Sequence, residues 1–567
     1  WACLGWQAPP EYLQVLHPID RVGGYQVGLS TEVIPSVVRL CMGLHDQLQS
    51  VGLDVLRSII VSEWQLNENL GVVQAAIINA FDTMHRESAP IQSPFASAFL
   101  ERLGKHFVII KNTELHTLYE AVMSVIAEVD RLFNVLADLG EVRDPASRMV
   151  QLLRLMEFLR LSGQEEAYVC RIHELAELHV QAKNYSSAAC ALNLHVEVLN
   201  ESQPSRALSP AKIPGLETPA ELVQSRKDRL YRTMATYFEK GYCWENVIKT
   251  LKQLSEGREA TWDAAGIAQV RFDEARIYNT LAAGPVPLPR YFYVAFSDHE
   301  FFPESVRSRQ FIFEGPANCD RKSFSILLQV QYPYVENLGP DYKHPTSSTQ
   351  DPAVKISPVT VYKNQLHPIN QQGGVAPGFR EHVLTAQPIA FAMTSRHDNP
   401  AISVVDQVVE KTVFYTSTAF PTLLSYSPIV REERVILSPV QAAIDRTQRK
   451  TLNIAVAAHS TASKGESAAE TLIECIQASV DTSSTGSVAE YHRLLDSLTS
   501  RPGTGSTATN TMAESIYHDA LGGEVKTKES QLRDILITSL DDHARCLELA
   551  ISSPFIAPAI KEHLRTS

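Results

Sequence analysis

The side chains that could carry chemistry do not form a known catalytic motif. Residues 173–179 approach the helical zinc-protease pattern, in which a second histidine lies four positions after the first. Glu177 occupies that position and His179 comes two residues too late, so helix packing explains this stretch better. Gly503 and Gly505 lack the third glycine of a dinucleotide-binding turn and follow no predicted strand. We therefore expect no covalent catalytic residue, no metal site and no cofactor bound by this chain.

A polar segment, residues 479–487, interrupts an apolar helical pattern and is the best candidate for a functional site. Apolar residues at helical spacing precede and follow it; they are Leu472, Ile473, Ile476, Val488, Tyr491, Leu495 and Leu498. The segment is rich in Ser and Thr and contains Asp481 and Gly486, residue types that disfavour a continuous helix. Val480 is its one large apolar side chain. Two roles stay open for Val480: the side chain that the segment presents, or the last core residue of an ordinary helix, because it also lies four residues after Ile476.

The composition bounds the class of protein. With 567 residues the chain is long enough for several domains of roughly 100 to 200 residues each. The net charge of −13 argues against a nucleic-acid surface, which needs concentrated Lys and Arg. The cysteines lie far apart without a metal or disulfide spacing, and no apolar run of about 18 residues predicts a transmembrane segment. We expect a cytoplasmic protein without a signal peptide, with recruitment to membranes left to parts of the full chain beyond these residues.

Apolar periodicity predicts a mainly α-helical chain into which one β domain is inserted. Residues 1–140 are predicted to form a helical repeat scaffold of TPR-like or ARM-like type, and residues 145–285 to form paired TPR-like helices. After the β domain, residues 433–567 are predicted to form a helical bundle that contains the interrupted helix. Ser438 and Pro439 open this bundle as the N-cap and the first helical residue.

The β domain is predicted over residues 286–432. The helical period stops at a proline-rich stretch that begins at Gly284, and aromatic and β-branched residues dominate from Tyr291 to Phe296. The predicted strands cover residues 291–296, 309–313, 325–331, 359–362, 389–393 and 408–416. We expect these strands to form an antiparallel β-sheet of two packed layers.

The order of helical pairs, two-layer sheet and interrupted bundle resembles the DHR2 domain of the DOCK (CZH/CDM-type) guanine-nucleotide exchange factors, with preceding helical repeats. The segments that carry the likeness are residues 168–179, 184–195, 237–248, 289–296, 409–412, 420–424 and 437–444. They follow one another in the family's order over residues 145–560. By this resemblance, residues 145–285 correspond to lobe A, residues 286–432 to lobe B, and residues 433–567 to lobe C, which carries the nucleotide-sensor loop.

The resemblance implies an activity: release of GDP and loading of GTP on a Rho-family small GTPase, Rac-like first and Cdc42-like second. The family places a nucleotide-sensor valine in the loop that interrupts a lobe C helix, and Val480 is the only valine in the corresponding segment here. Asp481 and Gly486 would support the loop, and Ser484 is the alternative occupant of the sensor position. An apolar side chain at the Mg²⁺ position would remove a divalent charge from beside the phosphates and weaken GDP binding. GDP, GTP and Mg²⁺ would belong to the GTPase and not to this chain.

Partners follow from the same resemblance. We expect a homodimer through lobe A and the last helices, and an ELMO-like partner bound to regions beyond these residues. An alternative function is that of a catalytically silent helical-repeat adaptor, which would bind GTPases or other partners without accelerating exchange. An exchange assay on Rac-like, Cdc42-like and Rho-like GTPases separates the two.

Overall fold

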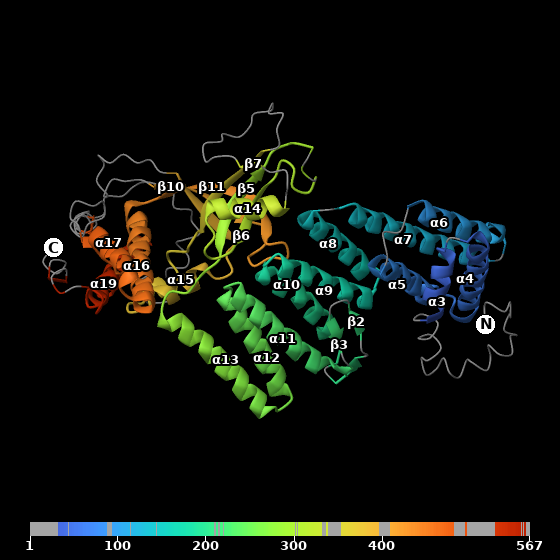
Figure 1. Cartoon of the computed structure of the whole chain (residues 1–567), viewed down its shortest axis with the longest axis horizontal. Coiled ribbons are helices and arrows are strands. Elements are labelled where there is room, and N and C mark those ends of the chain that lie inside the picture. Colours follow the sequence, from blue (N-terminus) through green and yellow to red (C-terminus); the bar gives the residue numbers. More distant parts are fainter. Residues whose placement is uncertain are drawn as a thin grey trace, which may run out of the picture. The chain divides into compact units, whose positions relative to one another are not determined.

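Helices account for most of the described chain, and one closed β-sheet lies in its C-terminal half (Figure 1). The computed structural model describes residues 32–562, except residues 44, 88–92, 114, 143, 204, 209–210, 214–215, 219, 301, 303, 332–335, 338–352, 396–408, 481–490, 492–493, 496–527, 557 and 559–560. Contacts group the chain into two compact units. The first holds Trp1–Lys183, Ala191–Arg226 and Val330–Pro333, and the second holds Asn184–Cys190, Lys227–Gln329 and Tyr334–Ser567.

The first unit is built from helices, most of which pack against their neighbours in sequence. They are α3 (Ile34–Cys41), α4 (Asp46–Asn67), α5 (Gly71–Glu87), α6 (Ser93–Phe107), α7 (His116–Glu141), α8 (Pro145–Leu161) and α9 (Glu165–Gln181), with the 3-10 turn η3 (Val108–Ile110) after α6. Asp144 caps α8 by accepting a hydrogen bond from the N–H of Ser147 at 2.8 Å. Of the helical scaffold expected over residues 1–140, residues 1–31 lie outside the described residues; helices are present in the described part from Ile34 on, and their assignment to a TPR-like or ARM-like repeat stays a prediction.

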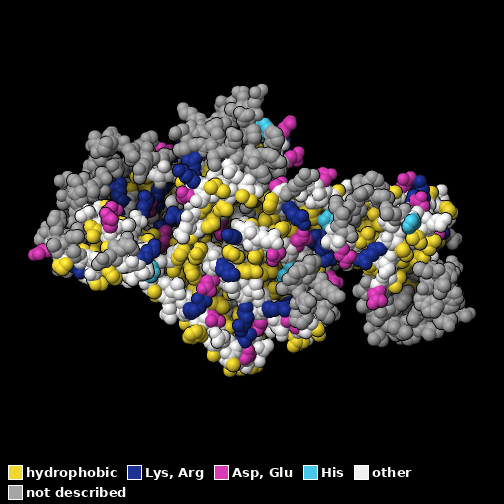
Figure 2. All heavy atoms as spheres, viewed as in Figure 1, with side chains coloured by type: hydrophobic (Ala, Val, Ile, Leu, Met, Phe, Trp, Pro, Cys, Tyr) yellow, Lys and Arg dark blue, Asp and Glu magenta, His cyan; other side chains and the backbone are white. Residues whose placement is uncertain are grey.

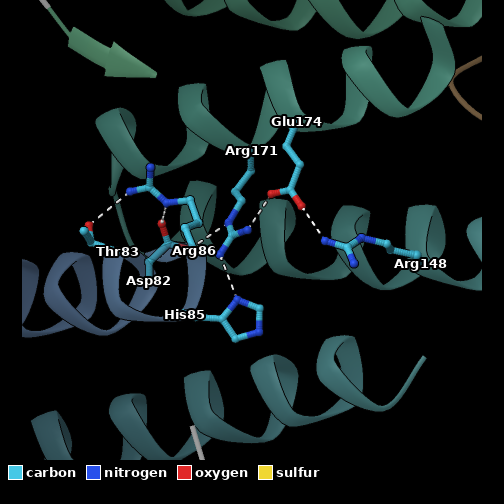
Figure 3. A network of polar contacts seen from close by, with 7 residues as sticks. All are labelled: Asp82, Thr83, His85, Arg86, Arg148, Arg171 and Glu174. Atoms are coloured by element: carbon cyan, nitrogen blue, oxygen red, sulfur yellow. Dashed lines mark hydrogen bonds and ion pairs between the residues drawn. The ribbon is translucent and has the colours of Figure 1, made fainter. Parts of the chain in front are cut away.

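A buried charged network joins three helices of the first unit (Figure 3). The guanidinium of Arg171 on α9 is 1% exposed and contacts the buried carboxylate of Asp82 on α5 at 2.7 Å. Arg171 also donates to Glu174 at 2.5 Å, and Arg86 donates to the second oxygen of Asp82 at 3.0 Å. Arg148 on α8 donates to Glu174 at 3.1 Å. Because a buried charge is costly without a partner, this network fixes how α5, α8 and α9 pack.

Between the first helices and the sheet, the chain forms further helices and two short β-ribbons. These elements are α10 (Tyr185–Asn200), β1 (Ala207–Leu208) paired with β4 (Glu221–Leu222), β2 (Ala211–Ile213) paired with β3 (Leu216–Thr218), α11 (Val223–Lys240), α12 (Trp244–Ala260) and α13 (Ala264–Ala283). Asp263 caps α13 by accepting from the N–H of Gly266 at 2.9 Å. The buried stripe of α13 is narrow; it consists of Gly266, Val270, Glu274, Ile277 and Leu281. Most of the surface of α13 is therefore exposed.

Six antiparallel strands of the second unit close into a barrel-like sheet. They are β5 (Arg290–Phe296), β6 (Gln310–Gly315), β8 (Ala353–Val361), β9 (Ala390–Ser395), β10 (Val409–Thr416) and β11 (Tyr426–Leu437). The sheet closes because β5 pairs with β6 along one edge and with β8 along the other. A two-residue strand, β7 (Glu336–Asn337), adds to β8 in parallel. The predicted antiparallel β domain is thus present, but its strands form one closed sheet and not two separate layers.

Strand β5 is buried on both of its faces. Alternate residues of β5 point into the sheet interior, where Tyr291 and Tyr293 pack with Phe391 and Phe414. The opposite face is covered by helix α14 (Arg321–Gln331), whose Phe324 stacks on Phe292 with ring centroids 4.0 Å apart. The continuous apolar run that predicted this strand therefore has two different packing partners.

The predicted strand over residues 325–331 is wrong, because this stretch forms the second half of α14. Asp320 starts the helix by accepting from the N–H of Ser323 at 2.8 Å. The periodicity of a short apolar run does not distinguish a strand from a buried helix. The helix N-cap Asp320, which precedes the run, was the signal that could have decided between them. Strand β11 was not predicted from the sequence. Its residues 431–434 are charged and exposed, so they interrupt the apolar pattern that indicates a strand.

A helical bundle follows the sheet. It contains α16 (Pro439–Lys464), the turn η5 (Gly465–Ala468), α17 (Ala469–Val480) and α19 (Lys528–Ile551). The side chain of Ser438 accepts from the N–H of Gln441, and the Gln441 side chain accepts from the N–H of Ser438. This reciprocal cap, with Pro439 at the first helical position, confirms the predicted start of the bundle.

Candidate functional site

The segment expected to interrupt a helix lies at the end of α17. Leu472 and Ile476 are fully buried in the bundle core, as their spacing predicts. Ser479, expected in the polar segment, instead completes the last turn of the helix, where its hydroxyl donates to the carbonyl of Cys475 at 3.1 Å. Val480 is the last residue of α17. The helical backbone therefore extends two residues further than predicted.

Three of the expected site residues, Asp481, Ser484 and Gly486, lie outside the described residues. The role of Val480 as a nucleotide sensor likewise stays a prediction. What the structure does place is the end of the helix from which this segment begins. Lys450 on α16 reaches that end, because its ammonium group donates to the carbonyl of Ala478 at 3.1 Å.

Two ion pairs, Arg380–Asp542 and Lys411–Asp445, join the bundle to the barrel and its connecting segments; we call them the polar seam. The first pair centres on Asp542 of α19. Arg380 of α15 (Pro377–Thr385) donates to this carboxylate at 2.6 Å, and both side chains are buried. The second oxygen of Asp542 accepts from the N–H of Gly374 at 2.8 Å. Arg380 also donates to the carbonyl of Gln372 at 2.8 Å. One carboxylate therefore orders the whole segment that leads into α15.

The second contact of the seam centres on Asp445 of α16. Lys411 of β10 forms an ion pair with it, and Gln365 donates to the same carboxylate at 3.3 Å. Burial alone would raise the pKa of Asp445, but the charge and hydrogen bond of Lys411, together with the bond from Gln365, outweigh burial and lower it. Asp445 is therefore held as a carboxylate, and it locks the barrel strand β10 to the bundle.

A cavity of about 540 Å³ lies beside the seam within the second unit. Trp244 at the start of α12, Pro287, His382 of α15 and Leu452 of α16 are among the residues that line it. The indole N–H of Trp244 donates to the carbonyl of Pro287 at 3.1 Å, which fixes one wall. The size is in the range of small-ligand sites. However, two of the charged side chains that line the cavity, Lys411 and Asp445, form an ion pair with each other and are therefore poorly placed to bind a charged ligand.

Charged and ligating side chains elsewhere form structural contacts. His173, in the zinc-protease-like stretch, contacts His195 of α10 at 2.9 Å. No three His, Cys, Asp or Glu side chains gather closely enough to hold a metal ion in the part of the chain that the structure describes. Within the same described ranges, no helix is both long and apolar enough to cross a bilayer.

Two aromatic side chains are unusually exposed on the α12–α13 pair. Trp262, in the turn between these helices, is 90% exposed, and Phe272 on the outer face of α13 is 68% exposed. Hydrophobic side chains lie among basic and acidic ones over this region in Figure 2. Exposed aromatic groups of this kind are a common feature of protein–protein contacts. The sequence pattern did not single them out, because their exposure depends on which face of α13 is packed.

The chain is similar in sequence to several dedicator-of-cytokinesis proteins. It is 22% identical over 490 residues to Dedicator of cytokinesis protein 4 of Mus musculus, a match that covers 83% of this chain and 24% of that protein. It is 23% identical over 440 residues to Dedicator of cytokinesis protein 3 of Homo sapiens, covering 74% of this chain and 21% of that protein. DOCK-like protein 1 of Saccharomyces cerevisiae is 23% identical over 355 residues, which cover 61% of this chain and 18% of that protein.

The chain spans about a quarter of the length of Dedicator of cytokinesis proteins 3 and 4 of Mus musculus. No family model matches it. The matches nevertheless cover most of the chain, and they involve more than one DOCK protein. They confirm the resemblance inferred from the sequence: this chain is a relative of the DOCK proteins.

Proposed function

We propose that this chain is a guanine-nucleotide exchange factor for a Rho-family small GTPase. The observation that carries the proposal is the similarity to DOCK proteins over 83% of the chain. The architecture supports it, because an antiparallel barrel leads directly into a helical bundle whose α17 ends at Val480. The activity needs no covalent step, since an exchange factor changes only the affinity of its GTPase for nucleotide. The absence of a recognisable catalytic motif in the sequence is compatible with this class of activity.

In the proposed mechanism, Val480 is the nucleotide sensor, Asp481 and Gly486 shape the segment after it, and Ser484 is the alternative sensor. Nucleotide affinity in a small GTPase depends on a Mg²⁺ ion that bridges phosphate oxygens and on ordered switch loops. An apolar side chain in the Mg²⁺ position removes this charge without replacing it, so GDP is bound less tightly. Each 1.4 kcal/mol of destabilisation corresponds to about a tenfold loss of affinity. By reciprocity, incoming GTP with Mg²⁺ weakens the complex and releases the loaded GTPase.

The polar seam gives this mechanism a rigid frame. The barrel and the bundle would hold the switch regions of the GTPase between them, so the distance between the two must not drift. The Arg380–Asp542 and Lys411–Asp445 pairs tie the two parts together with charge-assisted hydrogen bonds. Because the exchange factor is rigid, the energy of binding the GTPase deforms the nucleotide site of the GTPase and does not change the conformation of the exchange factor.

The test is the release of fluorescent GDP from Rac-like, Cdc42-like and Rho-like GTPases in the presence of the purified chain. We expect acceleration with the Rac-like GTPase first and the Cdc42-like GTPase second. Binding to a GTPase without faster GDP release would favour the alternative function, a catalytically silent adaptor. Neither binding nor acceleration with any of the three would refute both.

A homodimer, an ELMO-like partner and a cytoplasmic location are further parts of the proposal. The exposed aromatic residues of α13 and its preceding turn support a dimer contact in the helical part before the barrel. The last helix is a weaker candidate, since Leu540 on its apolar side packs partly buried against the bundle core. The exposed large apolar residues of α19 are Ile537 and Leu549. The ELMO-like partner would bind regions beyond these residues.

A further inference from the structure

We propose that Lys450 is a positioning residue for nucleotide exchange: its ammonium group holds the C-terminal turn of α17, from which Val480 is presented. This inference rests on the proposed function. Lys450 donates to the carbonyl of Ala478 at 3.1 Å. Ala478 lies two residues before Val480, the end of the helix. The contact therefore lies within one turn of the proposed sensor.

The chemistry of a helix end explains why a lysine acts there. The last four carbonyl groups of an α-helix have no N–H partner within the helix, and the carbonyl of Ala478 is one of them. These carbonyls also carry the partial negative charge of the helix dipole, which favours a cation. A lysine that satisfies such a carbonyl restrains the direction in which the chain leaves the helix. For α17, that direction decides where Val480 is delivered.

Lys450 can act as a restraint because its own turn of α16 is anchored. The hydroxyl of Thr451, the next residue, donates to the carbonyl of Thr447 at 2.8 Å, so it accepts from Nδ1 of His543 at 2.9 Å. His543 belongs to α19 and is buried, and burial, with the nearby charge of Lys450, lowers its pKa to about 4. The Sγ of Cys546 on the same helix lies 3.7 Å from the carbonyl of Thr451. A continuous path of contacts therefore links α19, α16 and the end of α17.

A purely structural role is the competing explanation, in which Lys450 stabilises the bundle and does nothing for exchange. The two explanations differ in what they change. If Lys450 is only a structural cap, its removal lowers the melting temperature and leaves the exchange kinetics of the folded protein unchanged. If it is a positioning residue, its removal lowers kcat of exchange, because the sensor is presented less often in the productive geometry, and leaves KM for the GTPase nearly unchanged.

The experiment measures fluorescent-GDP release with the full chain as Lys450→Ala, Lys450→Arg and wild type, over a range of GTPase concentrations. Arg449→Ala is the matched control, since it removes an exposed positive charge from the neighbouring position of the same helix. We expect Lys450→Ala to lose at least about fivefold in kcat, with KM within about twofold and the melting temperature within about 3 °C. Lys450→Arg should recover most of kcat, because arginine can also donate to the carbonyl.

Each outcome decides the proposal. Retention of wild-type kcat in Lys450→Ala would overturn it, as would a loss confined to KM or a loss equalled by Arg449→Ala. If wild type accelerates exchange and only Lys450→Ala is slow, the positioning role stands. If wild type accelerates no GTPase of the three, the proposed function fails first and the positioning role falls with it.

Discussion

At the scale of single residues, the candidate site is defined by the last turn of α17. Leu472 and Ile476 bury their side chains two turns and one turn before Val480, respectively. The last four carbonyls of the helix have no N–H partner within it, and Lys450 binds one of them, that of Ala478; the hydroxyl of Ser479 bonds back to the carbonyl of Cys475 one turn earlier. The sequence could locate this site because its apolar period is regular. It placed the helix end two residues too early, since a Ser or Thr hydroxyl can also bond back to its own helix.

Val480→Ala should slow nucleotide exchange while leaving the fold nearly intact. Removal of two methyl groups from the sensor leaves less apolar volume to exclude Mg²⁺, so fluorescent-GDP release should fall at least about tenfold. If Val480 were a core residue, the same change would lower the free energy of unfolding by about 1.5 kcal/mol and spare exchange. Ile476→Val is the matched control, because Ile476 is buried on the same helix. It should cost about 1 kcal/mol of stability without slowing exchange.

Glu314→Gln should remove a pH dependence of stability. The carboxylate of Glu314 is buried. Ser186 donates to one of its oxygens at 2.6 Å, and the other oxygen has no hydrogen-bond partner among the described residues. Burial raises the pKa of Glu314 to about 7 from 4.5. The folded state therefore binds a proton more tightly than the unfolded state, and stability falls as the pH rises from about 4.5 to about 7. Above the pKa of Glu314 in the folded state, the free energy of unfolding is lower by the full amount, about 3 kcal/mol.

Denaturant unfolding of wild type and Glu314→Gln between about pH 5 and pH 8 measures this effect. The variant should gain stability relative to wild type as the pH rises. Glu304→Gln, an exposed glutamate of the same unit, should show no such trend. A difference between wild type and Glu314→Gln that is independent of pH would contradict the prediction.

At the scale of elements, the sequence predicted best where one period continued long enough. The start of α16 was certain because Ser438, Pro439 and Gln441 all signal a helix N-terminus. Strand β5 was found from its aromatic and β-branched run. Closure of the sheet could not be predicted, since it depends on the pairing of β5 with β8, more than 50 residues apart in the chain. The polar seam was missed for the same reason: its partners, such as Arg380 and Asp542, have no periodic signal and meet only in the fold.

Asp82→Asn should loosen the packing of α5 against α9. The amide keeps the shape of the carboxylate but removes the charge that compensates the buried guanidinium of Arg171. Loss of one partner of a buried ion pair costs about 3–5 kcal/mol. Hydrogen exchange measured by mass spectrometry should therefore rise in peptides from α5 and α9. Glu87→Gln, which breaks the exposed Arg39–Glu87 pair, should leave exchange unchanged, and equal effects of the two variants would contradict this account.

At the scale of the whole molecule, the exposed face of α13 bears on how copies of the chain associate. One stripe of its exposed residues repeats at spacings of three and four; it consists of Ala265, Ala268, Phe272, Ala275, Asn279 and Ala282. This spacing is typical of a seam between two helices, in which small residues let the backbones approach and one large side chain fills a hole. Trp262, in the turn that leads into α13, extends the apolar surface. The proposed homodimer would bury these groups.

Phe272→Glu should therefore convert the dimer to a monomer. The side chain is 68% exposed, so a charge there costs the folded subunit little, whereas two glutamates facing one another across a symmetric contact repel and stay desolvated. Light scattering should show the mass falling by half, with an unchanged melting temperature at concentrations where wild type is also monomeric. Leu549→Glu is the matched variant on α19, where Leu549 is exposed, and it reports whether the last helix contributes. If Phe272→Glu keeps the wild-type mass and Leu549→Glu loses it, the contact belongs to α19. If both keep the mass of a dimer, neither helix forms the contact.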